Sequence, residues 1–523
     1  MNSLRGSLLP CRCLILAITL LVAGRAAAEP PSARTPWPVS VAADGFSAAQ
    51  AEQVLRDFAP MKLAGSGDQA LYTYLNMAAF FPHHLIARGA SERTLPVAVR
   101  DAIGDLRVGT DLGELSLTDL LADPRSRIQG LLVLHRGQVV FESYPGMRAS
   151  DSHLWWSVAK VIAGLLTEML IEEGRIAPER DIVSYLPEFS GSGWDGVSVD
   201  DVLDMASGIA ALDSAEDYVD PASEIGRLIY AEGVLSRPGH TPTGHDEALK
   251  AMTAAAPPGR YAYSSANTNM LGLLIERVTG QRYADVVQKR IWSRIGAEGD
   301  ALLGLSPDGR AIAHGMFSSR LRDLGRFGLV FTSRGSDALQ LPARLQQRLR
   351  DTGGSERYRK AAAVADRMAQ QMGARPVAAP AQWDALFADG DLFKSGFDGQ
   401  VLYVSPQREV VIAMYSTSRN RRAYAYLRAI AGAFAPSAEA SAVSTRCSSL
   451  LRKTANTISA RWRGLEPTSN SRTARSATEK PSLGESRSSI ISTTVGVTVA
   501  RPSSRPAVSA EVTTESAPDC SSR

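Results

Sequence analysis

The chain has 523 residues, with 57 lysines and arginines against 54 aspartates and glutamates, so its formal net charge is +3. This near balance gives no reason to expect nucleic-acid binding. The central part of the chain contains no cysteine, which excludes a thiol nucleophile and a thiolate metal site there. The four cysteines are Cys11, Cys13, Cys447 and Cys520, and a disulfide between the last two is allowed in an oxidising compartment.

The first 28 residues have the pattern of a secretory signal peptide. Arg5 and Arg12 precede an apolar run over 14–23, and three alanines at 26–28 supply the small residues that a signal peptidase accepts. The run is shorter than the roughly 20 apolar residues of a membrane-spanning helix. We therefore expect an exported protein, periplasmic or secreted, without a membrane span after cleavage. A retained N-terminal anchor is the alternative.

Composition divides the rest of the chain into three parts. Residues 29–125 mix proline-rich stretches with short helical patterns, such as the one over 48–58, and are expected to form an N-terminal extension packed on the catalytic domain. Residues 126–435 are predicted to form that domain. Residues 436–523 are rich in serine, threonine and arginine with few aromatic residues, so we expect a disordered tail.

Hydrophobic patterns predict an α+β fold for the catalytic domain. Two apolar runs within 129–144 flank a turn at 135–138 and predict a β-hairpin. Strands at 401–404 and 410–414 predict a second hairpin, which a helix over 422–434 follows. A hydrophobic helix is expected over 157–173, with Gly174 as its cap. Together these elements indicate one antiparallel sheet flanked by helices, with a mostly helical second lobe.

Ser157 and Lys160 form the one Ser-x-x-Lys sequence in the chain, at the start of this helix. Residues three apart share a helix face, so the lysine amine can reach the serine hydroxyl. A lysine can activate a serine when burial or a nearby charge lowers its pKa from about 10.4. The alternative is a helix-capping serine beside a solvated surface lysine.

Two downstream segments favour the catalytic interpretation. The first contains Tyr263-Ser264-Ser265 and leads into an apolar helical pattern at 270–275. The second is Lys394-Ser395-Gly396-Phe397, which leads into the second hairpin. Either segment alone is compatible with ordinary core or surface residues, but their order after Ser157 argues against coincidence.

The three segments together resemble the serine β-lactamase and penicillin-binding-protein superfamily, in particular its class C-like branch with 6-aminohexanoate-dimer hydrolases and esterases. The resemblance spans residues 125–435 and implies a β-lactamase/transpeptidase-like fold. It implies Ser157 as nucleophile, and Lys160 and Tyr263 as the acid/base pair. It also implies an oxyanion hole formed by the backbone N–H groups of Ser157 and Phe397. The residues expected to bind substrate are Ser265, Lys394, Ser395, Gly396 and Tyr218, the last on a loop over the pocket.

Two details depart from the family pattern. Ser265 stands where lactam-hydrolysing relatives usually carry asparagine, which points away from antibiotic hydrolysis. Lys394 either acts as the lysine of the third motif or lies beside a Gly-x-x-Gly-Gln variant in which another residue faces the substrate. Tyr74-Leu75-Asn76 also has the Tyr-x-Asn pattern, but it precedes Ser157 whereas the family order places this motif after the serine.

The resemblance implies a serine hydrolase that acts on small esters or linear amides without a metal or cofactor, and the N-terminal pattern adds the expectation of export. The alternatives are a β-lactamase or D-amino-acid peptidase, and a silent protein of the same fold that binds peptidoglycan or a partner. His153 near Ser157 leaves a Ser-His-Asp triad open as a weaker possibility. The sequence does not determine the oligomeric state.

Overall fold

We describe the protein from a computed structural model, which describes residues 36–60, 67–335, 339–418 and 423–436. The predicted signal peptide lies outside these residues, as do Cys447, Cys520 and all but the first residue of the predicted tail. None of the helices in the described ranges combines the length and the apolar character needed to cross a bilayer.

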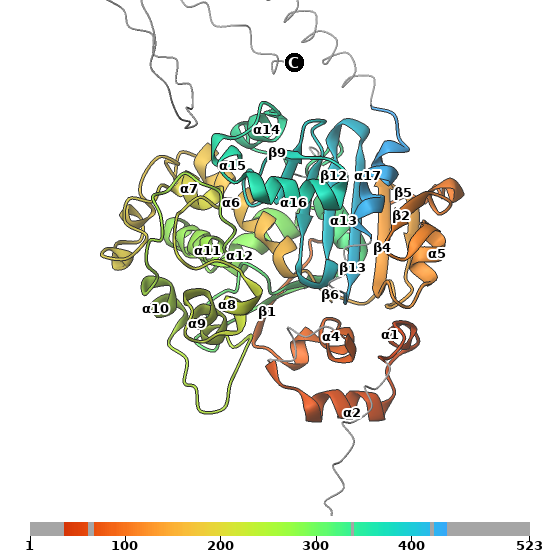
Figure 1. Cartoon of the computed structure of the whole chain (residues 1–523), viewed down its shortest axis with the longest axis horizontal. Coiled ribbons are helices and arrows are strands. Elements are labelled where there is room, and N and C mark those ends of the chain that lie inside the picture. The colour runs from red at the N-terminus through yellow and green to blue at the C-terminus, as the bar shows by residue number, and fades with distance from the viewer. Residues whose placement is uncertain (1–35, 61–66, 336–338, 419–422, 437–523) are drawn as a thin grey trace, which may run out of the picture.

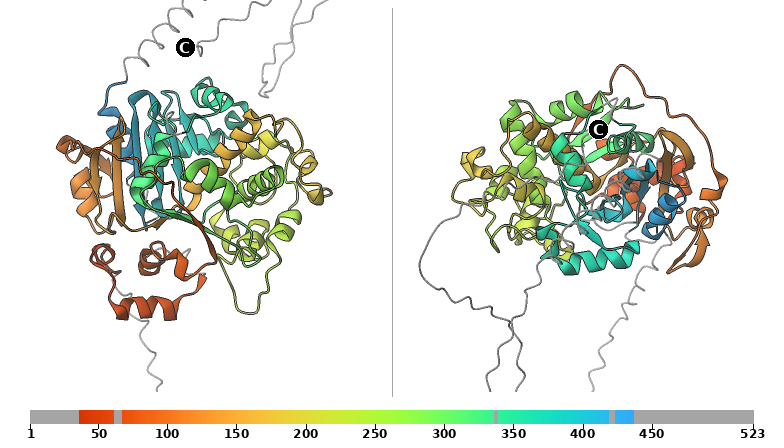
Figure 2. Two further views of the ribbon diagram at one scale, coloured as in Figure 1. Left: turned by 180° about the vertical axis from the view of Figure 1, so that it is seen from behind. Right: turned by 90° about the horizontal axis from the view of Figure 1, so that it is seen from above.

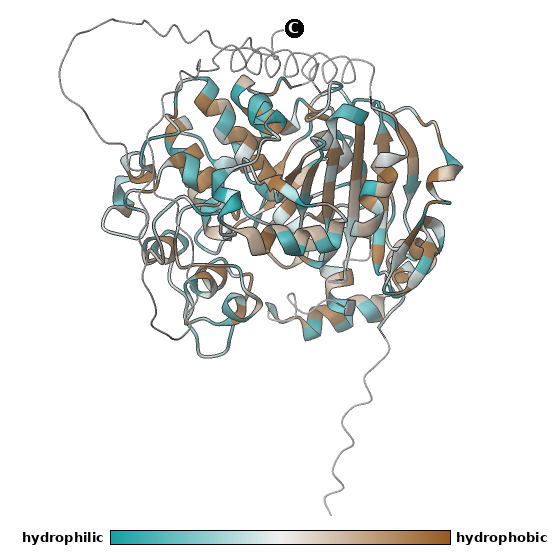
Figure 3. Cartoon of the chain, turned by 45° about the horizontal axis from the view of Figure 1, so that its top comes forward, coloured by the Kyte–Doolittle hydropathy of each residue, from teal (hydrophilic) through white to brown (hydrophobic). Residues whose placement is uncertain are grey.

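The centre of the fold is a seven-stranded antiparallel sheet in the order β5-β4-β13-β12-β11-β10-β9. Every residue of β4 and β13 is buried, because helices cover both faces of the sheet (Figure 1). Figure 3 shows apolar residues along these central strands. The strands are β4 (Ile128–His135), β5 (Gln138–Ser143), β9 (Pro376–Ala378), β10 (Ala385–Phe387), β11 (Leu392–Ser395), β12 (Val401–Ser405) and β13 (Val410–Ser416).

Successive residues of β4 serve two different cores, because neighbouring side chains of a strand point to opposite faces. Leu132 and Leu134 join a core with α6 and α13, whereas Leu131 and Val133 join one with α5, α16 and α17. Gly325 lets α13 approach the sheet, since a Cβ at this position would lie 2.6 Å from a methyl group of Leu132. The bounds are α5 (Leu117–Ala122), α6 (Lys160–Glu172), α13 (Leu321–Leu329), α16 (Ala362–Met372) and α17 (Tyr424–Gly432).

A lobe of helices lies at one side of the sheet, away from β5 (Figures 1 and 2). This arrangement agrees with the predicted α+β class and with the predicted helical second lobe. The helices of the lobe and of the neighbouring segment are α7 (Val199–Leu203), α8 (Ala215–Val219), α9 (Glu224–Ala231), α10 (His245–Lys250), α11 (Ser265–Thr279), α12 (Tyr283–Val287), α14 (Ala343–Arg350) and α15 (Glu356–Arg359).

The segment before the large sheet contributes to a second sheet. Strand β1 pairs with β7, so residues near position 85 are tied to residues near position 302. The order of this four-stranded sheet is β1-β7-β8-β6. The other elements are α1 (Ser40–Asp44), α2 (Ala48–Asp57), α4 (Gly67–Thr73), β1 (His83–Ile86), β2 (Arg107–Thr110), β3 (Gly113–Ser116), β6 (His153–Leu154), β7 (Ala301–Gly304) and β8 (Phe317–Ser319).

Both predicted hairpins are present. The β4–β5 turn contains Arg136 and Gly137, whose φ values of 52° and 76° suit the tight turns that join twisted strands. The turn between β12 and β13 is a 3-10 turn, Pro406–Arg408, that ends at Glu409, with a φ of 56°. The predicted closing helix corresponds to α17, and the pattern over 48–58 corresponds to α2.

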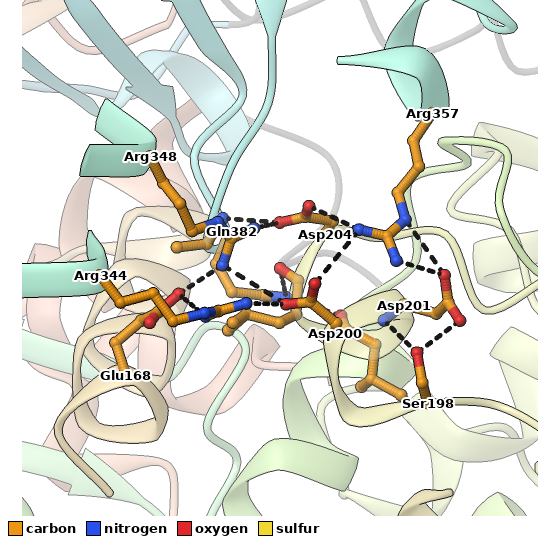
Figure 4. Close-up of polar contacts among 12 residues, drawn as sticks. Glu168, Ser198, Asp200, Asp201, Asp204, Arg344, Arg348, Arg357 and Gln382 are labelled. Carbon is orange, nitrogen blue, oxygen red and sulfur yellow. Dashed lines mark hydrogen bonds and ion pairs between the residues drawn. The ribbon is translucent and has the colours of Figure 1, made fainter. Parts of the chain in front are cut away.

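A cluster of ion pairs anchors α6 through Glu168, in the C-terminal half of the helix (Figure 4). Glu168 on α6 is fully buried and pairs with Arg344 and Arg348 of α14. Arg344 also contacts Asp200, and Arg348 contacts Asp204. These contacts hold α6, which begins at Lys160, in one position relative to the neighbouring helices.

Candidate active site

Ser157 lies in a 3-10 turn, Trp156–Ala159, that leads directly into α6. The predicted helix therefore begins with a tighter turn than the sequence pattern indicated. Trp156 has a φ of +48°, in the left-handed region that residues other than glycine rarely adopt. Backbone conformations of this kind concentrate at functional sites. The bend at Trp156 places Ser157 at the N-terminal end of α6, where the helix dipole favours negative charge.

Lys160 is fully buried and directed at Ser157. Its Nζ lies 2.9 Å from Ser157 Oγ, 3.0 Å from Ser265 Oγ and 2.9 Å from the main-chain oxygen of His314. Burial lowers the pKa of Lys160 to about 7, against the opposing effect of carboxylates such as Asp213 and with a contribution from the nearby charge of Lys394. Lys160 can therefore exist as a neutral amine near neutral pH, which a general base requires.

Ser265 links Lys160 to a carboxylate. Its Oγ lies 2.6 Å from Asp213 Oδ2, and its backbone N–H donates to Asp213 Oδ1 at 2.8 Å. Ser265 is the first residue of α11, and Ser264 caps this helix by accepting from the N–H of Ala266. The helix start thus orients the Ser265 hydroxyl between Lys160 and Asp213.

A second carboxylate lies behind the main-chain oxygen that accepts from Lys160. The ring of His314 contacts Glu232 Oε2 at 2.8 Å, and Asn269 Nδ2 donates to Glu232 Oε1 at 2.5 Å. Burial of Glu232 favours a raised pKa, but the contacts with His314, His245 and Asn269 outweigh it and lower the pKa. Glu232 is therefore ionised, and its charge favours the ammonium form of Lys160.

Tyr263 lies between the two lysines of the site. Its ring centre is 5.2 Å from Lys160 Nζ and 4.7 Å from Lys394 Nζ, and Lys394 Nζ lies 3.2 Å from its Oη. Burial raises the pKa of Tyr263 well above 10, and the carboxylates of Asp384 and Asp213 raise it further. The phenol therefore keeps its proton at neutral pH, which suits a proton donor.

Lys394 and Ser395 share one carboxylate partner. Lys394 is fully buried and forms an ion pair with Asp384 Oδ1. Asp384 Oδ2 accepts from the Ser395 backbone N–H at 2.8 Å and lies 2.7 Å from Ser395 Oγ. The third motif thus lies next to Tyr263, but its polar groups face a carboxylate of the protein.

Gly396 allows the end of β11 to pack closely against Trp155 and Trp156, the two residues before the nucleophile. A Cβ at Gly396 would lie 2.5 Å from the main-chain oxygen of Trp155, so a larger residue cannot occupy this position without a shift. The next residue, Phe397, has its ring centre 5.4 Å from that of Trp156. Close packing at glycine therefore places the backbone of Phe397 beside the turn that carries Ser157.

A shallow, mainly apolar hollow is lined in part by Trp156, the residue that precedes Ser157. Tyr218 lines it from α8, which is a short helix where the sequence indicated a loop. An apolar hollow next to a nucleophile suits an uncharged organic group. The lining residues are Trp156, Tyr218, Val234, Leu235 and Phe397.

His153 and Tyr74 contact groups other than Ser157. The ring nitrogens of His153 lie 2.9 Å from the main-chain oxygen of Leu154 and 2.8 Å from Gln129 Oε1. These partners include no carboxylate, so the geometry does not support a Ser-His-Asp triad. The Tyr74 hydroxyl donates to Asp398 at 2.8 Å, whereas Tyr263 is the tyrosine beside both lysines.

Comparison with known proteins identifies the family. Residues 118–435, well over half of the chain, match the sequence profile of the family described as Beta-lactamase. The chain belongs to the beta-lactamase family. This match confirms the resemblance that the three sequence motifs indicated, and the fold is that of a serine hydrolase.

Two relatives place this beta-lactamase-family chain more closely. A 6-aminohexanoate-dimer hydrolase of Paenarthrobacter ureafaciens is 36% identical over 226 residues, which are 42% of this chain and 57% of the relative. The match thus spans a little over half of that relative's length. A solved Bacillus anthracis protein, provisionally named a 6-aminohexanoate-dimer hydrolase, has 24% identity and a TM-score of 0.59, covering 70% of this chain and 92% of that one. At this identity the likeness establishes the fold.

The carboxylates of this beta-lactamase-family site were not found from the sequence. Asp213 lies 52 residues before Ser265, and nothing in the local pattern connects them. For Asp384 the sequence does contain a signal. Asp384 directly precedes a short hairpin, β10–β11, and the pairing of these two strands brings Lys394 next to Asp384. Glu232 sits at the end of α9, and no sequence pattern distinguishes it from a surface glutamate.

Proposed function

We propose that this protein is an exported serine hydrolase that forms an acyl-enzyme through Ser157 and acts on small esters or linear amides. One observation carries the proposal: Lys160 Nζ lies 2.9 Å from Ser157 Oγ in a buried position that lowers the lysine pKa to about 7. A serine hydroxyl becomes a useful nucleophile when a positioned base accepts its proton.

In the proposed acylation, Ser157 Oγ attacks the substrate carbonyl carbon while its proton passes to neutral Lys160. The carbonyl oxygen gains negative charge, and the backbone N–H groups of Ser157 and Phe397 are the proposed donors to it. Loss of one such donor typically costs about 3 kcal/mol in the activation barrier. The position of Ser157 at the start of α6 supports this assignment, because the helix dipole also favours the developing charge.

Tyr263 is the proposed proton donor to the leaving group. When the bond from carbonyl carbon to leaving oxygen or nitrogen breaks, the phenol supplies the proton, and Lys160 returns the proton from Ser157 to the phenolate. Water then attacks the acyl-enzyme ester, gives one proton to the same pair, and releases the acid with Ser157 protonated again. The raised pKa of Tyr263 supports this division, since a phenol that keeps its proton at pH 7 cannot serve as the resting base.

Two observations favour esters and linear amides as substrates. The Paenarthrobacter ureafaciens relative is named for a linear amide, the 6-aminohexanoate dimer. The shallow hollow that Trp156 and Phe397 line is mainly apolar, which suits contact with an aliphatic or aromatic part of a substrate. Export is proposed from the N-terminal sequence pattern.

The decisive experiment is labelling of the purified protein with a fluorophosphonate probe, followed by intact-mass measurement and peptide mapping. We expect one adduct, on Ser157, and none in Ser157→Ala. The control Ser190→Ala changes an exposed serine elsewhere on the surface and is expected to label like the wild type. A folded wild-type protein without an adduct at Ser157 would contradict the proposal and favour a silent binding protein.

A further inference from the structure

The lysine of the third motif is neutralised inside the protein. The side chains of Lys394 and Asp384 are 0% and 8% exposed, and they form a direct ion pair. A buried ion pair of this kind is costly to break, because separation leaves each charge without a partner in a poorly polarisable interior. Lys394 is therefore committed to Asp384 and to the hydroxyl of Tyr263.

Ser395 is committed to the same carboxylate. Its hydroxyl lies 2.7 Å from Asp384 Oδ2, and this oxygen also accepts the Ser395 backbone N–H at 2.8 Å. One carboxylate thus engages both polar side chains of the third motif. A substrate that reached this edge of the site would find their donors already in use.

The other lysine of the site is engaged as well. An ammonium group has three donors, and Lys160 directs its Nζ at Ser157, Ser265 and the main-chain oxygen of His314. Neither lysine of the site is left to bind an anionic group of a substrate.

The charged groups around the nucleophile leave no excess of positive charge. The groups that act on Lys160 are Lys394 and the three carboxylates Asp213, Asp384 and Glu232. Glu232 is in contact with His314 and His245. Asp213 and Asp384 balance the two lysines, so the site gains a net negative charge when Lys160 gives up its proton. A substrate carboxylate placed here would be repelled and would also lose its hydration.

From these contacts we infer that Asp384 is a specificity-determining residue. It engages Lys394 and Ser395, and the enzyme therefore selects acyl groups that carry no carboxylate over acyl groups that carry one. This inference rests on the proposed function, because it presumes that Ser157 is acylated.

The test compares two substrates that differ in one charge, mono-4-nitrophenyl adipate and methyl 4-nitrophenyl adipate. Both release 4-nitrophenol, so the leaving group is the same. For the wild type at low ionic strength, we expect kcat/KM for the neutral ester to exceed that for the anionic ester by about tenfold or more. Salt should reduce this ratio, since it screens the repulsion. A wild-type ratio near one would overturn the inference without any variant.

Asp384→Asn provides the second arm, because it removes the carboxylate and frees the ammonium of Lys394. The ratio of kcat/KM for the neutral ester to kcat/KM for the anionic ester should fall by about tenfold. Comparing the two esters on the same preparation cancels any loss of folded or active enzyme. The control Asp389→Asn removes a carboxylate of the same hairpin that pairs with Arg408 and Arg428 instead, and it should keep the wild-type ratio.

An Asp384→Asn protein that labels at Ser157 but keeps the wild-type ratio would overturn the role of Asp384. In the double variant Asp384→Asn/Lys394→Met, the relative kcat/KM for the anionic ester should fall below that of Asp384→Asn again, because the freed ammonium is gone. Failure of the proposed function looks different: Ser157 would not label, and neither ester would be turned over.

Discussion

The amine of Lys160 lies 2.9 Å from the hydroxyl of Ser157, and the lysine side chain is fully buried. This geometry predicts that Lys160→Met lowers kcat/KM for a neutral ester by about 10³-fold, within the range that a positioned acid/base group contributes. The control Lys360→Met removes an exposed lysine that pairs only weakly with Glu356. Steady-state kinetics of both variants check the prediction, and equal activity of the Lys160 variant and the control would contradict it.

The lowered pKa of Lys160 also predicts the pH dependence. Below about pH 7 the amine is protonated and cannot accept the proton of Ser157, whereas above it the neutral amine dominates. We expect kcat/KM to rise with pH and to reach half of its plateau near pH 7, with a tenfold loss per pH unit on the acid side. Circular dichroism over the same range separates this titration from acid unfolding. An acid limb centred near pH 4 would instead indicate a carboxylate base.

Tyr263→Phe tests the proton donor. Removal of the hydroxyl should slow amide hydrolysis by about 10²-fold or more, since a departing amine needs a proton in the transition state. Turnover of a 4-nitrophenyl ester should fall less, because 4-nitrophenolate leaves without one. The control is Tyr261→Phe. Tyr261 lies two residues before the proposed donor in the chain, and its buried ring packs against Tyr358. Equal losses on both substrates would assign Tyr263 a structural role.

The ion-pair cluster around Glu168 of α6 predicts that loss of one of its arginines strongly lowers the stability of the fold (Figure 4). Arg348→Met removes a partner of both Glu168 and Asp204 and leaves Glu168, which is fully buried, with fewer compensating charges. We expect the free energy of unfolding to fall by about 3 kcal/mol. Arg350→Met on the same helix removes an exposed guanidinium that donates to Gln346 Oε1 at 3.4 Å, and it should cost at most about 0.5 kcal/mol. Denaturant titration distinguishes the two, and similar losses would show that the cluster contributes little.

The sequence by itself determined the features that depend on short separations along the chain. Lys160 follows Ser157 by three residues, so any helical turn brings the two side chains to one face. The hairpins were predictable because apolar runs of strand length flank Gly137 and Pro406. The order of the three motifs was sufficient to identify the family, and membership of the family implies the fold.

The tertiary structure alone decided which groups surround the nucleophile and how they are charged. Asp213 reaches Ser265 across 52 residues, and Glu232 reaches His314 across 82. A pKa near 7 for Lys160 requires burial and neighbouring charges that arise when distant elements pack together. The same holds for Asp384, whose carboxylate turns Lys394 from a free cation into one half of a buried ion pair. Local spacing sets which side chains can meet, but the packing of the whole fold sets their solvation and their electric field, and these decide the chemistry.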